Sequence, residues 1–408
     1  MAIFGERLRV VGEGAVLRSD RKIKAARGRQ RGELDCRHEL KSGREFPRSM
    51  QFRPKAKPER AEHDQKEDKQ HAEDDAQSCS PLAPAQLHLY ARGMRTLVTG
   101  GAGFIGSHLV EKLLSAGHAV AILDDFNDFY DPQIKHANLA GVAEQVQIHN
   151  LDLRNAQGVR ELFQREKFDL IVHLAARAGV RPSISQPQLY FETNVNGTLH
   201  LLEAARAVGL ERFIFASSSS VYGVSKVVPF AEDLHLTQTI SPYAATKIAG
   251  EFLCSTYSHL YKMRIVALRF FTVYGARQRP DLAIHRFTRQ IHEGQPIDQF
   301  GDGTTRRDYT YIDDIIQGVM AALDYNGPMF DVFNLGESET IQLRDLITEI
   351  EHALGRKALI NRLPEQPGDV PITCADISKA RKLLGYNPVT PLQAGLPKFV
   401  EWFLTRPA

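Results

Sequence analysis

The feature that most constrains the fold of this chain is a repeated alternation of short apolar runs and helix-length segments, which begins just after Met94. Six runs rich in β-branched and other apolar residues are expected to be strands, at residues 95–99, 119–123, 146–151, 170–174, 213–217 and 265–270. Parallel strands joined by right-handed helical crossovers satisfy this order most economically, and continuous apolar runs suit strands that are buried on both faces. The pattern predicts an α/β fold with a doubly wound parallel sheet.

A glycine-rich turn follows the first expected strand. Gly100, Gly103 and Gly106 stand between that strand and an amphipathic helix. This spacing allows a tight turn, close approach of the backbone to a pyrophosphate, and close packing of the helix on the strand, while the amides at the helix N-terminus attract an anion. Such glycines can also form an ordinary turn, but their place at the start of a strand–helix series favours a bound dinucleotide.

Acidic residues at the ends of the next two strands indicate which dinucleotide is bound. Asp124 ends the second expected strand, where a carboxylate can accept hydrogen bonds from ribose hydroxyls, and Asp125 follows it. No Arg or Lys follows until Lys135, and two carboxylates would repel a 2′-phosphate, so NAD is predicted rather than NADP. Asp152 and Leu153 follow the third strand and are candidates for the adenine edge, although Asp152 could equally cap the next helix.

A Tyr and a Lys on one helix face are candidates for catalysis. Ser241 and Pro242 predict an N-cap and a first helical turn, which places Tyr243 and Lys247 on the same face. A phenol with a pKa of about 10 is a poor base at neutral pH, and a nearby ammonium favours the phenolate. The serines at 217–220, at the carboxyl end of the fifth expected strand, would face the same crevice. Alone, the pair would be a solvated helix face, but beside these features a catalytic role is preferred.

The residues before Met94 differ in composition from the rest. They hold 20 basic and 15 acidic residues, basic from 18 to 60 and acidic from 62 to 75, with few apolar clusters. Such a segment cannot bury enough apolar surface to offset its ordering entropy. We expect residues 1–93 to be a disordered or non-native leader rather than an arm that binds nucleic acid or a partner.

The other 315 residues, with 31 basic and 34 acidic side chains, are long enough for a large core and should carry the chemistry. We expect an NAD-binding domain at 94–275 and a smaller substrate-binding lobe at 276–408, with about 309–335 returning to the first domain and 309–325 helical. Trp402 is expected to pack within a terminal helix.

Cysteine usage and hydropathy indicate the compartment. Four cysteines, at 36, 79, 254 and 374, are too few and too scattered for a disulfide framework or a zinc module. No apolar run reaches the roughly 18 residues that a membrane span needs, and the charged N-terminus is unlike a signal peptide. A cytoplasmic protein is predicted, without a metal, a membrane or a nucleic acid as partner.

Taken together, these motifs resemble the extended short-chain dehydrogenase/reductase superfamily, and within it the NAD-dependent nucleotide-sugar 4-epimerases, with the UDP-glucuronate 4-epimerase branch nearest. The resemblance covers nearly all of 94–408. It rests on TGGAGFIG at 99–106, HLAA at 173–176, NVNGT at 194–198, SSSSVYG at 217–223, YAATK at 243–247, RFFTVYG at 269–275, RDYTY at 307–311 and PGD at 367–369.

The resemblance implies roles for individual residues. Tyr243 would be the catalytic base, Lys247 would hold the nicotinamide ribose, and Ser218 would bind the reacting hydroxyl. Arg307 would hold the diphosphate of a UDP-sugar, although it could instead form a surface ion pair, and Asp369 would hold the uridine ribose. Besides Tyr243 and Lys247, the cofactor would contact Gly100, Gly103, Phe104, Ile105, Gly106, Asp124, Asp125, Asn127, Asp152, Leu153, Leu174, Ala175, Ala176, Asn194 and Phe270.

The residues before Val-Tyr-Gly bear on the reaction. Dehydratases and decarboxylases of the superfamily carry acidic residues there, whereas this chain has Ser219 and Ser220, which favours redox chemistry at C4 alone. We therefore expect UDP-glucuronate to be epimerised to UDP-galacturonate by transient oxidation at C4 and return of the hydride to the opposite face.

The uronate is favoured because residues 178–187 and 269–281 look like the glucuronate branch, although Ala276 stands where that branch usually has Pro. Thr272 and Arg279, with Ser218, Ser219 and Ser220, would hold the C6 carboxylate, and Arg181 is a weaker candidate. The alternatives are a UDP-glucose or broad-specificity 4-epimerase and, more distantly, an NAD-binding regulatory protein. A homodimer is common in the superfamily and is expected here.

Overall fold

The computed structural model describes residues 93–365 and 370–406. The predictions made for the leader up to residue 92 and for the PGD motif with Asp369 lie outside these residues. Within the described part, no helix is both long enough and apolar enough to span a bilayer.

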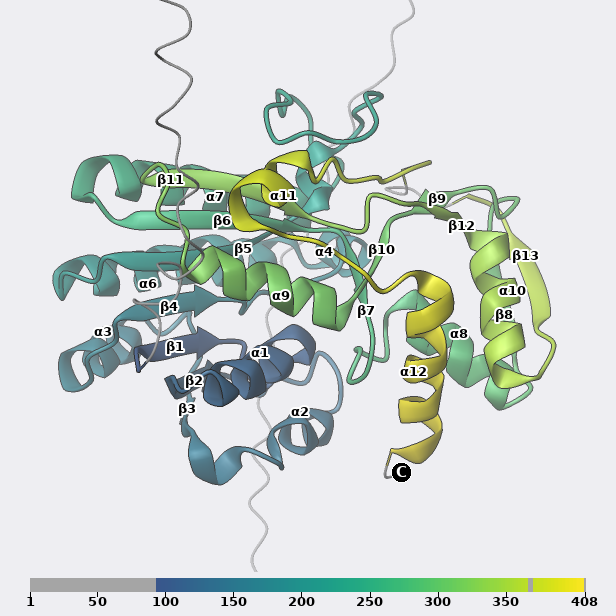
Figure 1. Ribbon diagram of the computed structural model, residues 1–408, viewed down its shortest axis with the longest axis horizontal. Coiled ribbons are helices and arrows are strands. Elements are labelled where there is room, and N and C mark those ends of the chain that lie inside the picture. Colours follow the sequence, from purple (N-terminus) through teal and green to yellow (C-terminus); the bar gives the residue numbers. More distant parts are fainter. Residues whose placement is uncertain (1–92, 366–369, 407–408) are drawn as a thin grey trace, which may run out of the picture. The chain divides into compact units, whose positions relative to one another are not determined.

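A seven-stranded sheet, in which every strand is parallel to its neighbours, forms the centre of the described residues (Figure 1). Its order is β11-β6-β5-β4-β1-β2-β3. The order runs outward in both directions from β1, so the chain reverses its winding between β1 and β4, as in a Rossmann fold. The prediction of a doubly wound parallel sheet is confirmed. The strands are β1 (Arg95–Thr99), β2 (Ala119–Asp124), β3 (Gln147–Asn150), β4 (Leu170–His173), β5 (Arg212–Ser218), β6 (Arg264–Phe270) and β11 (Phe330–Leu335).

Six of these strands coincide with the six expected runs, and their ends differ by no more than one residue. The seventh, β11, was not expected as a strand because polar residues interrupt its apolar pattern. Asp331 accepts a hydrogen bond from the Tyr325 hydroxyl (2.6 Å), and the Asn334 amide donates to the carbonyls of Phe230 and Asp376. Tertiary partners that satisfy these polar groups make them compatible with a strand in the sheet.

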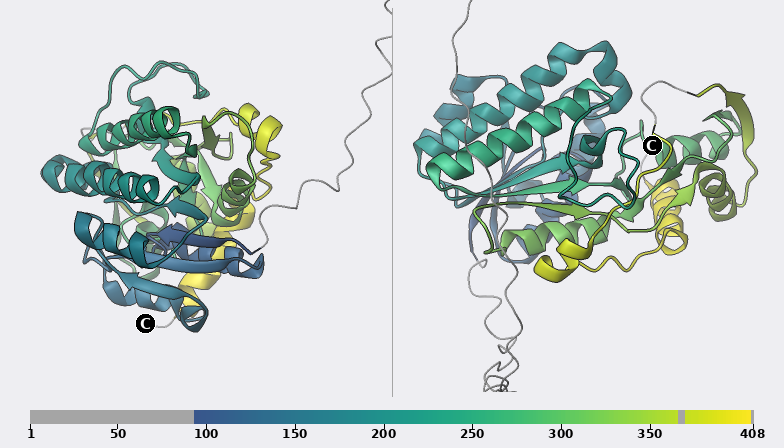
Figure 2. Two further views of the ribbon diagram at one scale, coloured as in Figure 1. Left: turned by 90° about the vertical axis from the view of Figure 1, so that its left-hand side faces the viewer. Right: turned by 90° about the horizontal axis from the view of Figure 1, so that it is seen from above.

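Helices cover both faces of the sheet (Figure 2). On one face, the apolar side chains of α1 (Phe104–Ser115) and α9 (Ile312–Leu323) pack on residues such as Val98 and Ile122. On the other face, α3 (Ala156–Arg165), α6 (Gly197–Ala207) and α7 (Pro242–Tyr261) enclose a second core with Leu97 and Phe213. Burial of the strands on both faces explains their continuous apolar runs.

The expected helix at 309–325 begins only at Ile312. The residues before it form β10 (Tyr309–Tyr311), which pairs in parallel with β7 (Thr272–Tyr274). The helix α9 then packs against α1, and β11 pairs with β6. The proposed division into a domain at 94–275 and a lobe at 276–408 stays a prediction.

The remaining elements include three two-stranded sheets, β10-β7, β12-β9 and β13-β8. In the terminal helix, α12 (Leu392–Thr405), Trp402 packs against Phe399 and His285, at 5.6 and 5.8 Å between ring centroids, which confirms its expected packing role. The other α-helices and strands are α2 (Pro132–Leu139), α4 (Val180–Ser185), α5 (Pro187–Phe191), α8 (Ala283–His292), β8 (Pro296–Phe300), β9 (Arg306–Arg307), β12 (Ile341–Gln342), α10 (Leu343–Leu354), β13 (Leu359–Leu363) and α11 (Ser378–Leu384). Three short helical turns are η2 (Ala143–Gln145), η3 (Glu192–Asn196) and η4 (Ser219–Tyr222).

Candidate active site

A cavity of about 450 Å³ lies at the carboxyl ends of the central strands. This is the edge of a doubly wound sheet at which ligands bind. Most of the site residues predicted from the sequence line it: Gly100, Gly103, Phe104, Ile105, Gly106, Asp124, Asp125, Asn127, Asp152, Leu153, Leu174, Ala175, Ala176, Ser218, Ser219, Ser220, Tyr243, Lys247, Phe270, Thr272 and Arg279.

The glycine-rich turn connects β1 to α1 with very close packing. Gly100 has φ of +71°, and its amide donates to the carbonyl of Leu123 on β2 (2.8 Å). A Cβ at Gly106 would lie 2.1 Å from the carbonyl oxygen of Gly100 and 2.7 Å from Cα of Gly101. Because both obstacles are backbone atoms, only glycine allows α1 to start this close to the strand. The first turn of α1 is thereby aimed into the cavity, as a dinucleotide pyrophosphate requires.

At the end of β2, Asp124 is held as an acceptor. It accepts from the amides of Ala102 (3.2 Å) and Phe126 (3.0 Å). Burial raises the pKa of Asp124, and the positive charge of Lys135 opposes this shift. Lys135 Nζ lies 3.5 Å from Asp124 and 3.9 Å from Asp125, and the lysine side chain is only 5% exposed. Lys135, which is ten residues from Asp125 in the sequence, therefore lines the predicted ribose site. The carboxylates of Asp124 and Asp125 neutralise its positive charge.

Asp152 is not a helix cap. The side chain of Asn155 caps α3 by accepting from the amide of Gly158 (3.0 Å), whereas Asp152 forms an ion pair with Arg154 (2.5 Å). Asp152 and Leu153 both line the cavity, so the capping alternative for Asp152 was wrong.

Asn194 was expected to line the cofactor site but lies buried behind the cavity wall. Its amide bonds to both backbone groups of Arg177, at 2.7 and 3.0 Å, and to the hydroxyl of Thr246 (3.0 Å). Thr246 in turn donates to the carbonyl of Tyr243 (2.7 Å). Asn194 thus ties the segment after β4, which lines the cavity, to the first turn of α7.

The helix α7 begins as predicted. The hydroxyl of Ser241 accepts from the amide of Ala244 (3.1 Å), and Pro242 occupies the first turn. Lys247 Nζ donates to the carbonyl of Ala216 on β5 (2.6 Å), and burial lowers the pKa of Lys247 to about 8. This contact fixes α7 to the strand end that carries the serines.

Tyr243 lies half-buried in the wall of the cavity. Burial raises the pKa of Tyr243, while a hydrogen bond with Ser218 and the positive charge of Arg279 act in the opposite direction. Lys247 Nζ lies 5.9 Å from the centre of the Tyr243 ring. Two cations therefore lie near Tyr243: Lys247, which the helix spacing predicts, and Arg279, which comes from a segment distant in sequence.

A second cavity, of about 170 Å³, adjoins the first and shares Val180, Ser219, Ser220 and Thr272 with it. Arg307 lines the second cavity. The pairing of β10 with β7 aligns Tyr309 with Thr272, which brings Arg307 close to the end of β6. Arg181 lines neither cavity, and its guanidinium lies 4.7 Å above the ring of Phe300.

Several lining residues were not predicted from the sequence. Phe129, Tyr130 and Lys135 come from the segment between β2 and the end of α2, and Arg177 and Thr193 come from segments after β4. The segment after β2 could be expected near the cofactor because it follows the carboxyl end of a strand. Its sequence has no periodicity that would show which of its side chains face the cavity. Within the described residues, no group of three or more His, Cys, Asp or Glu side chains is arranged to hold a metal.

Comparisons with known proteins bear on the family. The model of the GDP-mannose 4,6-dehydratase family matches residues 97–399. A UDP-glucuronate 4-epimerase of Thermodesulfobacterium geofontis is 43% identical over 309 residues, which cover 75% of this chain and 95% of that relative. The chain belongs to the NAD-dependent epimerase/dehydratase family. The resemblance to extended short-chain dehydrogenases/reductases seen in the motifs is thereby confirmed.

Further members of this epimerase/dehydratase family support the same placement. UDP-glucuronate 4-epimerase 4 of Arabidopsis thaliana is 43% identical over 332 residues, which cover 77% of this chain and 76% of the relative. The crystal structure of UDP-glucuronic acid 4-epimerase from Bacillus cereus in complex with UDP-glucuronic acid and NAD is similar with a TM-score of 0.72 and 40% identity, over 76% of this chain and 99% of that chain. The Thermus thermophilus UDP-glucose 4-epimerase in complex with NAD is similar with a TM-score of 0.71 and 34% identity, over the same shares.

Proposed function

We propose that this chain is an NAD-dependent UDP-glucuronate 4-epimerase that interconverts UDP-glucuronate and UDP-galacturonate. The observation that carries the proposal is that Ser218, Tyr243 and Lys247 line the same cavity as the glycine turn. The relatives in Thermodesulfobacterium and Arabidopsis bear this name, and the similar Bacillus cereus structure holds UDP-glucuronic acid and NAD.

The residues of the cavity fit NAD. Glycine at position 106 lets α1 begin close to β1, so that the amides at the N-terminus of α1 face the cavity and can bind the pyrophosphate. The Asp124 carboxylate also lines the cavity, where ribose hydroxyls can donate to it. Bound NAD would supply the hydride acceptor and donor for C4 of the sugar. The carboxylates of Asp124 and Asp125 beside Lys135 favour the unphosphorylated ribose.

Proton transfer at the C4 oxygen is assigned to Tyr243. Ser218 would hold the C4 hydroxyl, Tyr243 would accept its proton as the C4 hydride leaves, and the same proton would return when the hydride is delivered to the other face. Ser218 is suited to this task because it lines the cavity together with Tyr243 and its hydroxyl accepts from the amide of Ser220 (3.2 Å). The hydroxyls at 219 and 220 add no acid for the elimination of water, despite the dehydratase name of the matching family model.

The C6 carboxylate of a uronate would lie near Thr272 and Arg279, which line the same cavity as Tyr243. Oxidation at C4 turns the sugar into a β-keto acid, which loses CO₂ readily unless its carboxylate is held in an unproductive orientation. Hydroxyls of Ser219, Ser220 and Thr272 together with the guanidinium of Arg279 would supply that hold. In the adjoining cavity, Arg307 would meet the diphosphate.

Product analysis after incubation of the purified protein with UDP-glucuronate, without added NAD, tests the substrate, the reaction and the retention of the cofactor together. We expect UDP-galacturonate to appear. A parallel incubation with UDP-glucose tests the second candidate, which the similarity to the Thermus UDP-glucose 4-epimerase favours. Faster turnover of UDP-glucose would overturn the uronate assignment, and absence of any turnover with intact NAD binding would favour a regulatory NAD-binding protein.

The leader is proposed to be dispensable for this activity. All the residues assigned above lie within 94–408, so deletion of residues 1–93 should leave turnover of UDP-glucuronate unchanged. Loss of fold or of turnover in the shortened chain would show that the leader contributes.

A homodimer in the cytoplasm is proposed for the working enzyme. On α7, Phe252 and Leu260 lie on one face and are 66% and 58% exposed, which is unusual for large apolar side chains on a helix. Burial of this face against a second copy would cover both. Sedimentation of the wild-type protein and of Phe252→Glu should give a dimer and a monomer, respectively. Among the described residues, Cys254 and Cys374 are both free thiols, which suits a reducing compartment.

A further inference from the structure

The guanidinium of Arg279 already has a carboxylate partner. Its Nε and Nη2 donate to the two carboxylate oxygens of Asp281, at 2.9 and 2.8 Å. This bidentate pair occupies one edge of the planar guanidinium and leaves the edge formed by Nη1 and Nη2 for a further ligand. The Arg279 side chain is 19% exposed and that of Asp281 is 38% exposed, so water screens the pair only in part.

The arginine of this pair belongs to the cavity wall, whereas the aspartate does not. Arg279 and Leu282 line the larger cavity, and the guanidinium of Arg279 lies 5.4 Å from the centre of the Phe129 ring. Tyr243 lines the same cavity, and the positive charge of Arg279 acts to lower the pKa of Tyr243. Asp281, which does not line the cavity, therefore fixes the Arg279 side chain and at the same time reduces its net charge.

We propose that Asp281 is a specificity-determining residue that limits how tightly Arg279 holds the C6 carboxylate of the sugar. This inference rests on the proposed epimerase function. With Asp281 present, the bound uronate would be the second carboxylate on one guanidinium, so that two like charges lie on adjacent edges of the same cation. The repulsion between them offsets part of the attraction to Arg279.

A moderate hold suits an epimerase. The 4-keto sugar has to present both of its faces to the same hydride donor, so its ring and its carboxylate must move between oxidation and reduction. A carboxylate held tightly in one position would stabilise the bound substrate but not the state in which the sugar ring turns. The barrier to turnover would therefore rise. Asp281 weakens this contact without removing the cation that orients the carboxylate.

The test is Asp281→Asn, which keeps an acceptor for Arg279 but removes the negative charge. At a separation of about 6 Å and with partial exposure, loss of this charge should lower KM for UDP-glucuronate about fivefold. We expect kcat to fall as well, because the tighter hold is made in the ground state. UDP-glucose has no carboxylate, so its Ki as a competitor of UDP-glucuronate should not change.

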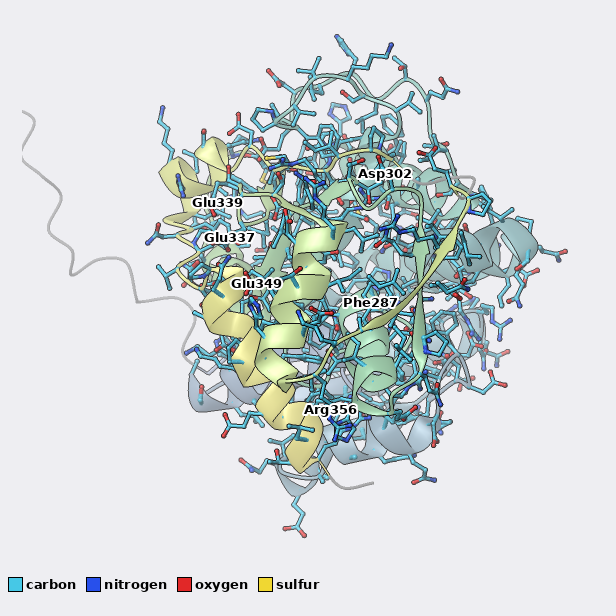
Figure 3. The ribbon with its side chains drawn as sticks, turned by 90° about the vertical axis from the view of Figure 1, so that its right-hand side faces the viewer. Phe287, Asp302, Glu337, Glu339, Glu349 and Arg356 are labelled. Carbon is cyan, nitrogen blue, oxygen red and sulfur yellow. The ribbon has the colours of Figure 1, made fainter. Side chains whose placement is uncertain are left out.

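Two controls separate this role from a structural one. Glu349 on α10 lines neither cavity and lies on the outer side of this part of the molecule (Figure 3), so Glu349→Gln should change neither KM nor kcat. In an Arg279→Met background, Asp281→Asn should no longer lower KM, because the charge acts through Arg279. The negative charge of Asp281 also attracts Arg286 of α8. If Asp281→Asn changed KM through Arg286, the change would persist in the Arg279→Met background.

The outcomes are distinct. An unchanged or raised KM in Asp281→Asn, or an equal change in the Ki of UDP-glucose, overturns the role proposed for Asp281. If the wild-type protein does not epimerise UDP-glucuronate, the proposed function itself has failed, and this is seen before any variant is measured.

Discussion

A buried ion pair beneath the active site is the clearest case in which a single charge should control stability. Glu251 on α7 accepts from Nε and Nη2 of Arg269 on β6, at 2.9 and 2.8 Å, and the side chains are 8% and 4% exposed. Ser217 donates to the same carboxylate, and Arg269 Nη1 donates to the hydroxyl of Tyr222 (3.0 Å). Burial by itself would lower the pKa of Arg269, but Glu251 raises it above its ordinary value.

Replacement of Glu251 by Gln leaves the Arg269 charge buried without a counter-charge. Breaking one partner of a buried pair typically costs about 3–5 kcal/mol, because the remaining ion is still desolvated. For a folded part of about 315 residues, the loss corresponds to a fall in Tm on the order of 5–8 °C. The less buried pair between Arg277 and Glu111, at 2.6 Å with side chains 24% and 37% exposed, provides a comparison, and Glu111→Gln should cost only about 1 kcal/mol.

Thermal unfolding of wild type, Glu251→Gln and Glu111→Gln in one buffer is the assay. We also expect Glu251→Gln combined with Arg269→Met to recover part of the lost stability, since the orphaned charge is then absent. If Glu251→Gln is no less stable than Glu111→Gln, the pair does not act as a buried counter-charge and the reasoning fails. A combined variant that is less stable than Glu251→Gln would contradict it in the same way.

Three further predictions follow from single positions. Gly106→Ala should abolish retention of NAD, measured as cofactor in the purified protein, because its Cβ would meet backbone at 2.1 Å; normal retention would contradict the packing argument. Tyr243→Phe should lower kcat by at least about 10²-fold while UDP still binds, and undiminished epimerisation would exclude Tyr243 as the base. Burial, with the nearby charges of Asp314, Asp308 and Glu339, raises the pKa of Glu337 to about 8 (Figure 3). Because this pKa lies above the ordinary 4.5, the stability that Glu337 contributes is present at acid pH and is lost as the pH rises through about 8. Glu337→Gln should therefore have the higher Tm at pH 9 but not at pH 4, below the ordinary pKa, and parallel pH curves for the two proteins would refute this.

Local sequence patterns were sufficient for most of the fold and for the centre of the site. Six strands, the turn around Gly106 and the cap at Ser241 each depend on residues close together in the chain, through buried apolar runs, backbone sterics and a side chain that bonds three residues ahead. The spacing of Tyr243 and Lys247 on one helix face is equally local. Such features are specified wherever the segment is placed, which is why the sequence predicts them.

Other features depended on segments that are distant in sequence and meet only in the folded chain. The approach of Lys135 to Asp124, the role of Asn194 behind the cavity wall, and the position of Arg307 beside Thr272 come from packing and strand pairing that no periodicity encodes. β11 was missed because its polar residues find partners only in the tertiary structure. The effect of Arg279 on Tyr243 was missed for the same reason, since helix spacing places Lys247 nearby but cannot show that Ala216 binds it and that Arg279 enters the cavity. Electrostatic influence depends on distance and burial in three dimensions, and these are decided by tertiary packing.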